Sequence, residues 1–467
     1  MNARLRALMV RLAAEPAELI FWGWGVLLTY ISFVPAYYLP PVSLRLGGFE
    51  FEILKYLPAA LALGTAFLFA LLCRFRLPLL SLQTPLLLLV LLNGAIEILS
   101  LFKASYPLWG ATKWLYFSAT GILVYLLSLG LNEPKVVRVL KLSLAAGTLV
   151  AGYGILEYLL GENLLYGSFY TQFNPYYSKD YQIASTIGIN IALGAYLVAL
   201  LPFSWYLLHG ARRRVLCYLV TAFITLALLL TYARSAWLAL LAASLVYALG
   251  LGKGLVPWLY KRRIQVLIVG LSCLSLSPVL QQAGVVRLFN QHRPPGLELE
   301  PRVALMWGRL AHFGESENFR LAQYGTALRV VSAHPLLGVG FGNFTRLFDQ
   351  YKSPDTPALN VRTTENMYLM VVCETGLTGL LAFLLLLGGI WWHLWRNCQS
   401  QAGPGKSKLP LAFLASYSGL LFNMAFWDAL NFPALRVLFW MIAGMGMALA
   451  LRGSPALEGG TGQGYPS

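Results

Sequence analysis

The chain has 467 residues, of which 58% are hydrophobic and 12% are charged, and its formal net charge is +16. A soluble globular protein carries about 25% charged residues, so this composition excludes a soluble domain and indicates a protein that crosses the membrane several times. The basic residues are not gathered on a polar domain, so we expect no nucleic-acid partner. We attribute the positive charge to membrane topology and to contact with anionic membrane lipid.

The five cysteines are scattered along the chain and form no CxxC pair or Cys/His pattern. Their spacing predicts neither a disulfide framework nor a zinc site. We expect no metal and no cofactor.

Runs of about 20 mainly apolar residues recur along the sequence, and each is long enough to cross a bilayer. We therefore predict an all-α polytopic integral membrane protein in which residues 1–467 form a single transmembrane domain. Basic residues fall mainly in alternate short loops, which places both termini in the cytosol. The twelve predicted spans lie near residues 19–39, 54–73, 79–100, 109–130, 136–160, 184–208, 214–231, 235–252, 264–280, 366–392, 409–429 and 433–451.

A large extracytoplasmic loop, residues 281–364, separates the ninth and tenth predicted spans. Long loops in compact proteins are usually functional. Within this loop the segment NFRLAQYGTALRVV predicts a short amphipathic helix that lies on the membrane surface or over a cavity. The predicted apolar face comprises Leu321, Tyr324, Leu328 and Val331. Residues 452–467 form a tail rich in glycine and proline, which we expect to be disordered.

Three charged residues fall at the outer ends of apolar segments in this topology: Arg234, Arg320 and Glu365. Each has a plain structural interpretation: a snorkelling arginine, a solvated loop charge and a carboxylate at a helix N-terminus. Arginines that converge at one outer cavity are also what binding of a diphosphate requires, because guanidinium is a planar, permanently charged, bidentate donor. The sequence has no nucleotide loop of the P-loop type and no HExxH motif.

The loop contains two further features of interest. Glycines 338, 340 and 342 in GVGFGN follow no strand, so we predict a turn that allows close packing rather than a nucleotide-binding loop. His334 precedes Pro335 at a predicted helix end, where contact with the helix dipole is a commoner role than that of a catalytic base.

Four segments in this order resemble the O-antigen ligase and polymerase superfamily of bacterial membrane glycosyltransferases. They read ASTIGINIALGAYLVALLP, TYARSAWLAL, SAHPLLGVGFGNF and TENMYLMVVCETGLTGLLAFLLL, and cover roughly residues 182–390. The resemblance implies a GT-C-like fold in the bacterial inner membrane, with an active site that faces the periplasm. It implies transfer of a glycan from a polyprenyl-diphosphate-linked oligosaccharide donor to an acceptor sugar hydroxyl, without a metal.

On this resemblance Arg234 and Arg320 hold the diphosphate and offset the charge that develops as the glycosidic bond breaks. Glu365 stands where ligases of the family usually carry a histidine, and we expect it to orient or deprotonate the acceptor. Gln182 stands where the family commonly has an arginine, with Lys179 nearby as a substitute cation. The other candidate substrate-binding residues are Asn190, Tyr232 and Asn366.

The change from histidine to Glu365 favours a polymerase of O-antigen or related polysaccharide, which extends a carrier-linked glycan. The alternative within the family is a ligase that transfers to lipid A core or to a protein. A small-anion transporter of the bicarbonate kind would place its charges near the bilayer midplane. A non-catalytic scaffold of an export complex would tolerate substitution of the arginines.

Overall fold

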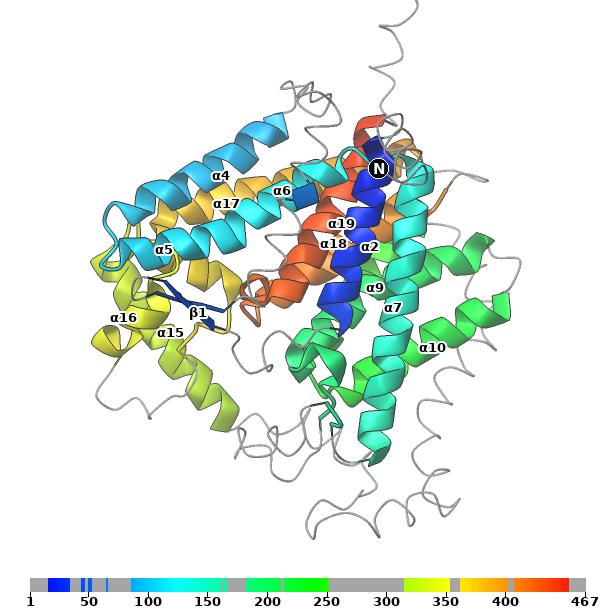
Figure 1. Cartoon of the computed structure of the whole chain (residues 1–467), viewed down its shortest axis with the longest axis horizontal. Coiled ribbons are helices and arrows are strands. Elements are labelled where there is room, and N and C mark those ends of the chain that lie inside the picture. Colours follow the sequence, from blue (N-terminus) through cyan, green and yellow to red (C-terminus); the bar gives the residue numbers. More distant parts are fainter. Residues whose placement is uncertain are drawn as a thin grey trace, which may run out of the picture.

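The structure is a computed structural model that describes residues 16–33, 43–46, 49–52, 64–65, 85–160, 163–165, 182–210, 214–251, 315–352, 362–401 and 407–452. Most of these residues form α-helices packed into one bundle (Figure 1). Strands β1 (Ser43–Leu46) and β2 (Phe49–Glu52) form a short antiparallel hairpin. The predicted helical fold class is therefore confirmed for the bulk of the described chain, with this hairpin as an addition.

The α-helices are α2 (Pro16–Phe33), α4 (Pro85–Leu101), α5 (Pro107–Trp114), α6 (Thr120–Ser128), α7 (Glu133–Leu160), α9 (Asn190–Gly210), α10 (Arg214–Leu230), α11 (Arg234–Leu251), α15 (Glu315–Ala333), α16 (Phe344–Tyr351), α17 (Met367–Ser400), α18 (Leu409–Met424) and α19 (Pro433–Arg452). Three short elements join them: a π-helix, η1 (Leu115–Ala119), and two 3₁₀ turns, η3 (Ser185–Ile187) and η5 (Ala429–Asn431).

Five of the described helices, α7, α9, α11, α17 and α19, are long and apolar enough to cross a membrane, and α2, α4, α10 and α18 contain shorter apolar stretches. The chain is therefore a membrane protein. The predicted spans 54–73 and 264–280 lie outside the described residues except for 64–65, and each of the other predicted spans overlaps at least one described helix. The total of twelve spans remains a prediction.

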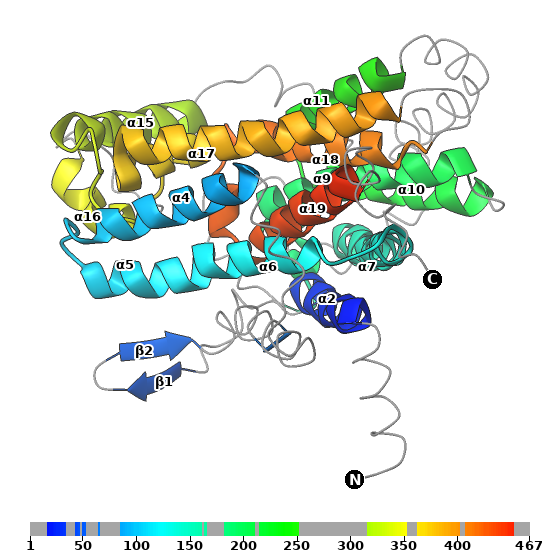
Figure 2. The ribbon, with the colours of Figure 1, turned by 90° about the horizontal axis from the view of Figure 1, so that it is seen from above.

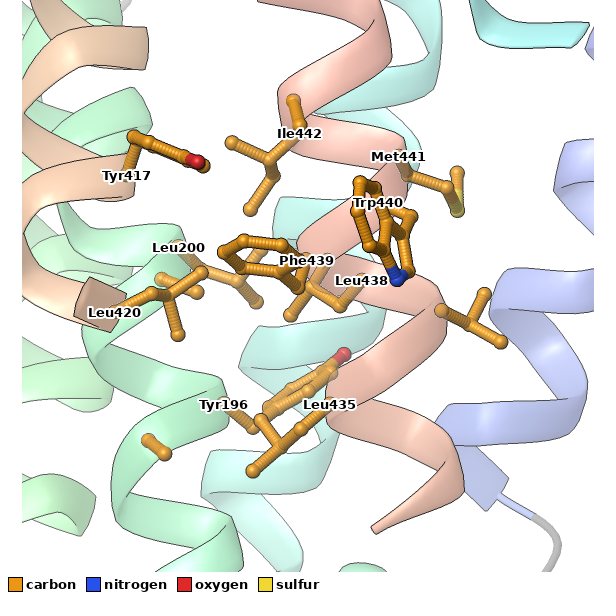
Figure 3. Packing of buried hydrophobic residues seen from close by; sticks show 14 of the residues in the cluster. Tyr196, Leu200, Tyr417, Leu420, Leu435, Leu438, Phe439, Trp440, Met441 and Ile442 are labelled. Carbon is orange, nitrogen blue, oxygen red and sulfur yellow. The ribbon is translucent and has the colours of Figure 1, made fainter. Parts of the chain in front are cut away.

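The centre of the bundle is formed by α9, α18 and α19, which are apolar on all sides, as helices surrounded by protein are. Figure 3 shows side chains from these helices packed together, among them Tyr196, Tyr417 and Phe439. The rings of Tyr417 and Phe439 stack with their centroids 5.3 Å apart. This core fixes the relative positions of the helix ends that carry the candidate site.

One end of the bundle, which we call the site end, is where α10 and α18 end and where α11 and α17 begin. The backbone N–H of Ile183 donates to the Leu230 carbonyl at 3.4 Å. The Nδ2 of Asn366 donates to the Ala425 carbonyl at 2.8 Å. Helices α15 and α16 pack against α17 at the end where it begins (Figure 2).

Helix α17 is broken at Gly376, whose φ of 70° lies in the left-handed region. The break frees backbone groups that would otherwise bond within the helix. The loop after α15 takes up these groups: Leu377 N–H donates to the Pro335 carbonyl at 2.8 Å, and Val339 N–H donates to the Cys373 carbonyl at 2.9 Å.

The glycines of the GVGFGN segment make this contact possible. Gly338, Gly340 and Gly342 have φ values of 64°, 94° and 73°, which side chains rarely adopt. Gly340 N–H donates to the Glu374 carbonyl at 2.9 Å. The prediction of a closely packed turn is confirmed.

The predicted amphipathic helix is present as α15, but its predicted apolar face is divided: Leu321 and Leu328 point away from the protein, whereas Val331 packs against a buried cluster. Leu321 is 64% exposed and Leu328 is 59% exposed, whereas Ala327 and Val330 are fully buried against the bundle. Small residues face inward because α15 approaches α17 closely, with the Cys373 thiol contacting the Ala327 carbonyl. The expected position of this helix, on the membrane surface or over a cavity, remains a prediction.

The predicted span 109–130 is not one regular helix, because the π-helix η1 interrupts it. The guanidinium of Arg436, in α19, donates from Nη1 to the Tyr116 carbonyl at 2.9 Å and lies 3.5 Å from the centroid of the Phe117 ring. Arg436 is only 3% exposed. A buried guanidinium needs several acceptors, and the irregular turn supplies one.

Gly376 provides a test of this packing. A β-carbon at Gly376 would collide with the Leu336 carbonyl, so we expect Gly376→Ala to destabilise the protein by about 2 kcal/mol. The matched control is Gly388→Ala on the same helix, where no atom lies within 4 Å of an added β-carbon. We expect this control to leave stability unchanged or to raise it by up to about 1 kcal/mol. Thermal unfolding of the two variants in detergent micelles compares them, and equal midpoints would contradict the proposed packing constraint.

Candidate functional site

The structure brings together two of the predicted catalytic residues, Arg320 and Glu365. Arg320 lies in the first turns of α15, and its Nε donates to Oε2 of Glu365 at 2.7 Å. The two side chains are 32% and 19% exposed, so the pair is partly shielded and still reachable from solvent. Glu365 has a φ of 45°, a strained conformation for a residue other than glycine.

Asn366, the next residue, fixes this geometry. Its side-chain oxygen caps α17 by accepting the N–H of Leu369 at 3.1 Å, and its Nδ2 donates to the Ala425 carbonyl. Asparagine is among the preferred N-cap residues because its oxygen satisfies a free N–H of the first turn. The structure therefore gives Asn366 a positioning role for Glu365, and its predicted contact with substrate remains a prediction.

Arg234 is the first residue of α11 and is half-buried. The backbone just before it is tightly constrained: Tyr232 has a φ of 51°, and Ala233 N–H donates to the Thr231 hydroxyl at 3.2 Å. Tyr232 itself is 7% exposed. The direction in which Arg234 leaves the helix end is thus set by a short, strained connection between α10 and α11.

Gln182 and Asn190, both predicted to bind substrate, contact each other and the same connection. Asn190 Nδ2 lies 2.5 Å from Gln182 Oε1 and donates to the Thr231 carbonyl at 3.1 Å. The predicted span 184–208 begins in the structure only at Asn190, because Gly188 has a φ of 90° and ends the preceding 3₁₀ turn. Lys179 lies outside the described residues.

Helix α18 connects the two groups of residues, because it packs against both α11 and α17. Gly419 of α18 lies against Ala239 and Ala243 of α11. On its other side α18 accepts the Tyr368 hydroxyl of α17 at the Leu421 carbonyl, at 2.8 Å. The start of α11, with Arg234, and the start of α17, preceded by Glu365, are therefore both held at the site end.

The sequence prediction did not include Asp428, between α18 and α19, which is 5% exposed and accepts Asn431 Nδ2 at 2.8 Å. Burial raises the pKa of its carboxyl above 3.8; Glu365 also raises it, whereas the Asn431 hydrogen bond and Lys113 lower it. An ionisable residue at the end of an apolar segment was the available signal. The prediction missed it because the span was drawn to 429, whereas α18 ends at Met424.

His334, weighed as a base in the sequence, lies exposed beyond the end of α15. Its Nε2 is 2.8 Å from the hydroxyl of Tyr351, at the end of α16. This contact joins the two helices of the loop and accounts for the residue structurally.

A comparison with protein families bears on these positions. Residues 218–384 match the family model described as O-antigen ligase, and this range contains Arg234, Arg320 and Glu365. Over this range the chain is similar to the O-antigen ligase family, which confirms the predicted resemblance to the O-antigen ligase and polymerase superfamily. The matched range runs from α10 to the middle of α17. No curated protein matches the chain.

Asp428 provides a test based on pH. Its carboxyl binds a proton more tightly in the folded protein, so its contribution to stability is fully present below the ordinary carboxyl pKa and is lost as the pH rises through the raised pKa. We expect Asp428→Asn, which stays neutral, to gain unfolding temperature relative to the wild type over this rise in pH.

The matched control for this test is Asp349→Asn. Asp349 lies near Lys352 and Arg362, at 2.9 and 2.8 Å, and these contacts lower the pKa of its carboxyl. We therefore expect the opposite sign: Asp349→Asn loses unfolding temperature relative to the wild type as the pH rises toward the ordinary carboxyl pKa, and the difference stays constant above it. A relative loss for Asp428→Asn over the same pH range would refute the assignment of a buried, destabilising charge.

Proposed function

We propose that the protein is a membrane glycosyltransferase that moves a glycan from a polyprenyl-diphosphate carrier to an acceptor sugar hydroxyl. The observation that carries the proposal is the ion pair of Arg320 with Glu365 inside the range that matches the O-antigen ligase family. The match of residues 218–384 to this family supports a glycan-transferring enzyme in general. The lipid-diphosphate donor, a GT-C-like arrangement of about twelve spans and an active site on the periplasmic side of a bacterial inner membrane belong to the proposal.

The geometry of the pair allows Arg320 to bind the donor while Glu365 binds the acceptor. Among the described residues, the contact engages Nε of Arg320 and Oε2 of Glu365. In the proposed complex, the terminal amino groups of Arg320 and the side chain of Arg234 bind the diphosphate, and Oε1 of Glu365 accepts the acceptor hydroxyl. Guanidinium donors aimed at a departing diphosphate stabilise charge as it develops, without a metal.

The reaction that follows is a direct displacement. The acceptor oxygen attacks the anomeric carbon, its proton passes to Glu365, and the bond from that carbon to the diphosphate oxygen breaks with its electron pair leaving on the diphosphate. One such displacement inverts the anomeric configuration. Holding the reacting groups in place supplies much of the rate, because a positioned reaction avoids the entropy cost of encounter.

We favour a polymerase because a carboxylate, Glu365, occupies the position where ligases of this superfamily usually carry histidine. The ligase is the second candidate, since the matched family model is itself described as O-antigen ligase. The family match gives no support to the small-anion transporter.

Substitution of the arginines tests the site. We expect Arg234→Ala and Arg320→Ala each to lower transfer at least about 100-fold, the loss typical when a donor to a developing anion is removed. The matched control is Arg329→Ala on α15, an exposed arginine that donates to the Tyr351 carbonyl at 2.8 Å. Activity is measured with purified, folded protein and a polyprenyl-diphosphate oligosaccharide. Wild-type activity in Arg234→Ala would remove that residue from the site.

The acceptor is tested by resolving the products on a gel, with and without added lipid A core. A ladder of lengthened carrier-linked glycans without added core is the result expected of a polymerase. Transfer only to the core would instead establish a ligase. Absence of transfer to either acceptor, from protein that binds the donor, would refute the proposed reaction.

A further inference from the structure

A buried carboxylate on α7, Glu157, holds the segment that leads into α9. Glu157 is 1% exposed and accepts two backbone N–H groups: that of Ala184, at 3.1 and 3.3 Å from its two oxygens, and that of Ser185, at 2.6 Å from Oε2. Acidic residues are rare in apolar helices, where they are costly and usually functional. Here the carboxylate accepts from the N–H groups of Ala184 and Ser185, which precede α9 and have no acceptor within that helix.

The segment held by Glu157 is strained and is fixed from several sides. Ser185 has a φ of 52°, and its hydroxyl donates to the Val150 carbonyl at 2.6 Å. The Nδ2 of Asn163 donates to the Ser185 carbonyl at 3.1 Å. A strained conformation persists only when several neighbouring groups hold it in place. Glu157 is the charged residue among the groups that hold Ser185.

Hydrogen bonds lead from this segment to the connection that carries Arg234. Ile183 N–H donates to the Leu230 carbonyl, and Asn190 Nδ2 donates to the Thr231 carbonyl. Thr231 and the strained Tyr232 are the last residues before Ala233 and the start of α11. The segment 182–190 therefore lies between Glu157 on one side and the backbone that aims Arg234 on the other.

We propose that Glu157 is a positioning residue: through residues 182–190 it places Arg234 to bind the diphosphate of a lipid-linked donor. The inference rests on the proposed function for the identity of the ligand. Glu157 does not touch the substrate in this proposal. A purely structural role would have Glu157 join α7 to α9 without any effect specific to Arg234.

The test uses Glu157→Gln, which preserves the size of the side chain but turns an amide NH₂ group toward one of the two N–H donors. The probe is polyprenyl diphosphate itself, with its dissociation constant measured on purified full-length protein in detergent micelles. We expect binding to weaken about tenfold, and the KM for the donor to rise with a smaller change in kcat, because misplaced binding groups weaken the donor complex first. The matched control is Glu133→Gln, an exposed glutamate at the start of the same helix.

A double-mutant cycle separates positioning from general stability. If Glu157 acts through Arg234, then Glu157→Gln has no further effect on binding in an Arg234→Ala background. The same fold loss in both backgrounds, or unchanged binding by Glu157→Gln alone, would overturn the inference. If Glu157→Gln does not fold, Glu157→Asp replaces it in the cycle, because the shorter side chain keeps the charge and withdraws its oxygens from the N–H groups of Ala184 and Ser185.

The proposed function fails in a different way. If the wild type does not bind polyprenyl diphosphate, the donor assignment is wrong. If the wild type binds and the cycle shows independent effects, the donor assignment stands and only the role of Glu157 is wrong.

Discussion

The structure depends on one constraint: inside an apolar bundle, every backbone group that leaves a helix must find a partner within the protein. At Gly376 the loop after α15 supplies these partners, and at the entrance to α9 the carboxylate of Glu157 does so. Asn366 performs the same task at the start of α17. The site end is thus built from non-helical backbone that neighbouring side chains and loops hold in place.

The same constraint concentrates strain where the chemistry is proposed. The described residues other than glycine with a positive φ are Ser185, Tyr232 and Glu365, and all three lie at the site end. Such conformations are costly and cluster at functional sites. Tyr232 and Glu365 are themselves candidate residues, and the N–H of Ser185 donates to Glu157. The irregular backbone thus carries the candidate site, and the regular helices support it.

The sequence predicted what hydropathy and charge encode locally. Apolar runs gave most helices, and Arg234, Arg320 and Glu365 were found as charges at helix ends. Two kinds of information were missing from it. The inward face of α15 includes Ala327 and Val330, whereas periodicity grouped Leu321 and Leu328 into an apolar face without showing that the structure leaves both leucines exposed. The role of Glu157 depends on contacts with residues 27 and 28 positions away, which no local pattern shows.

The exposed leucines of α15 link the geometry of the candidate site to the medium around the protein. Leu321 follows Arg320 directly, so the residue that pairs with Glu365 sits beside a side chain that is 64% exposed in the described part of the chain. Burying that leucine in acyl chains is favourable, and leaving it in water is not. The thickness and packing of the bilayer therefore bear on the position of the arginine. Preparations in different detergents or lipids would be expected to differ in activity even with an identical, fully folded chain.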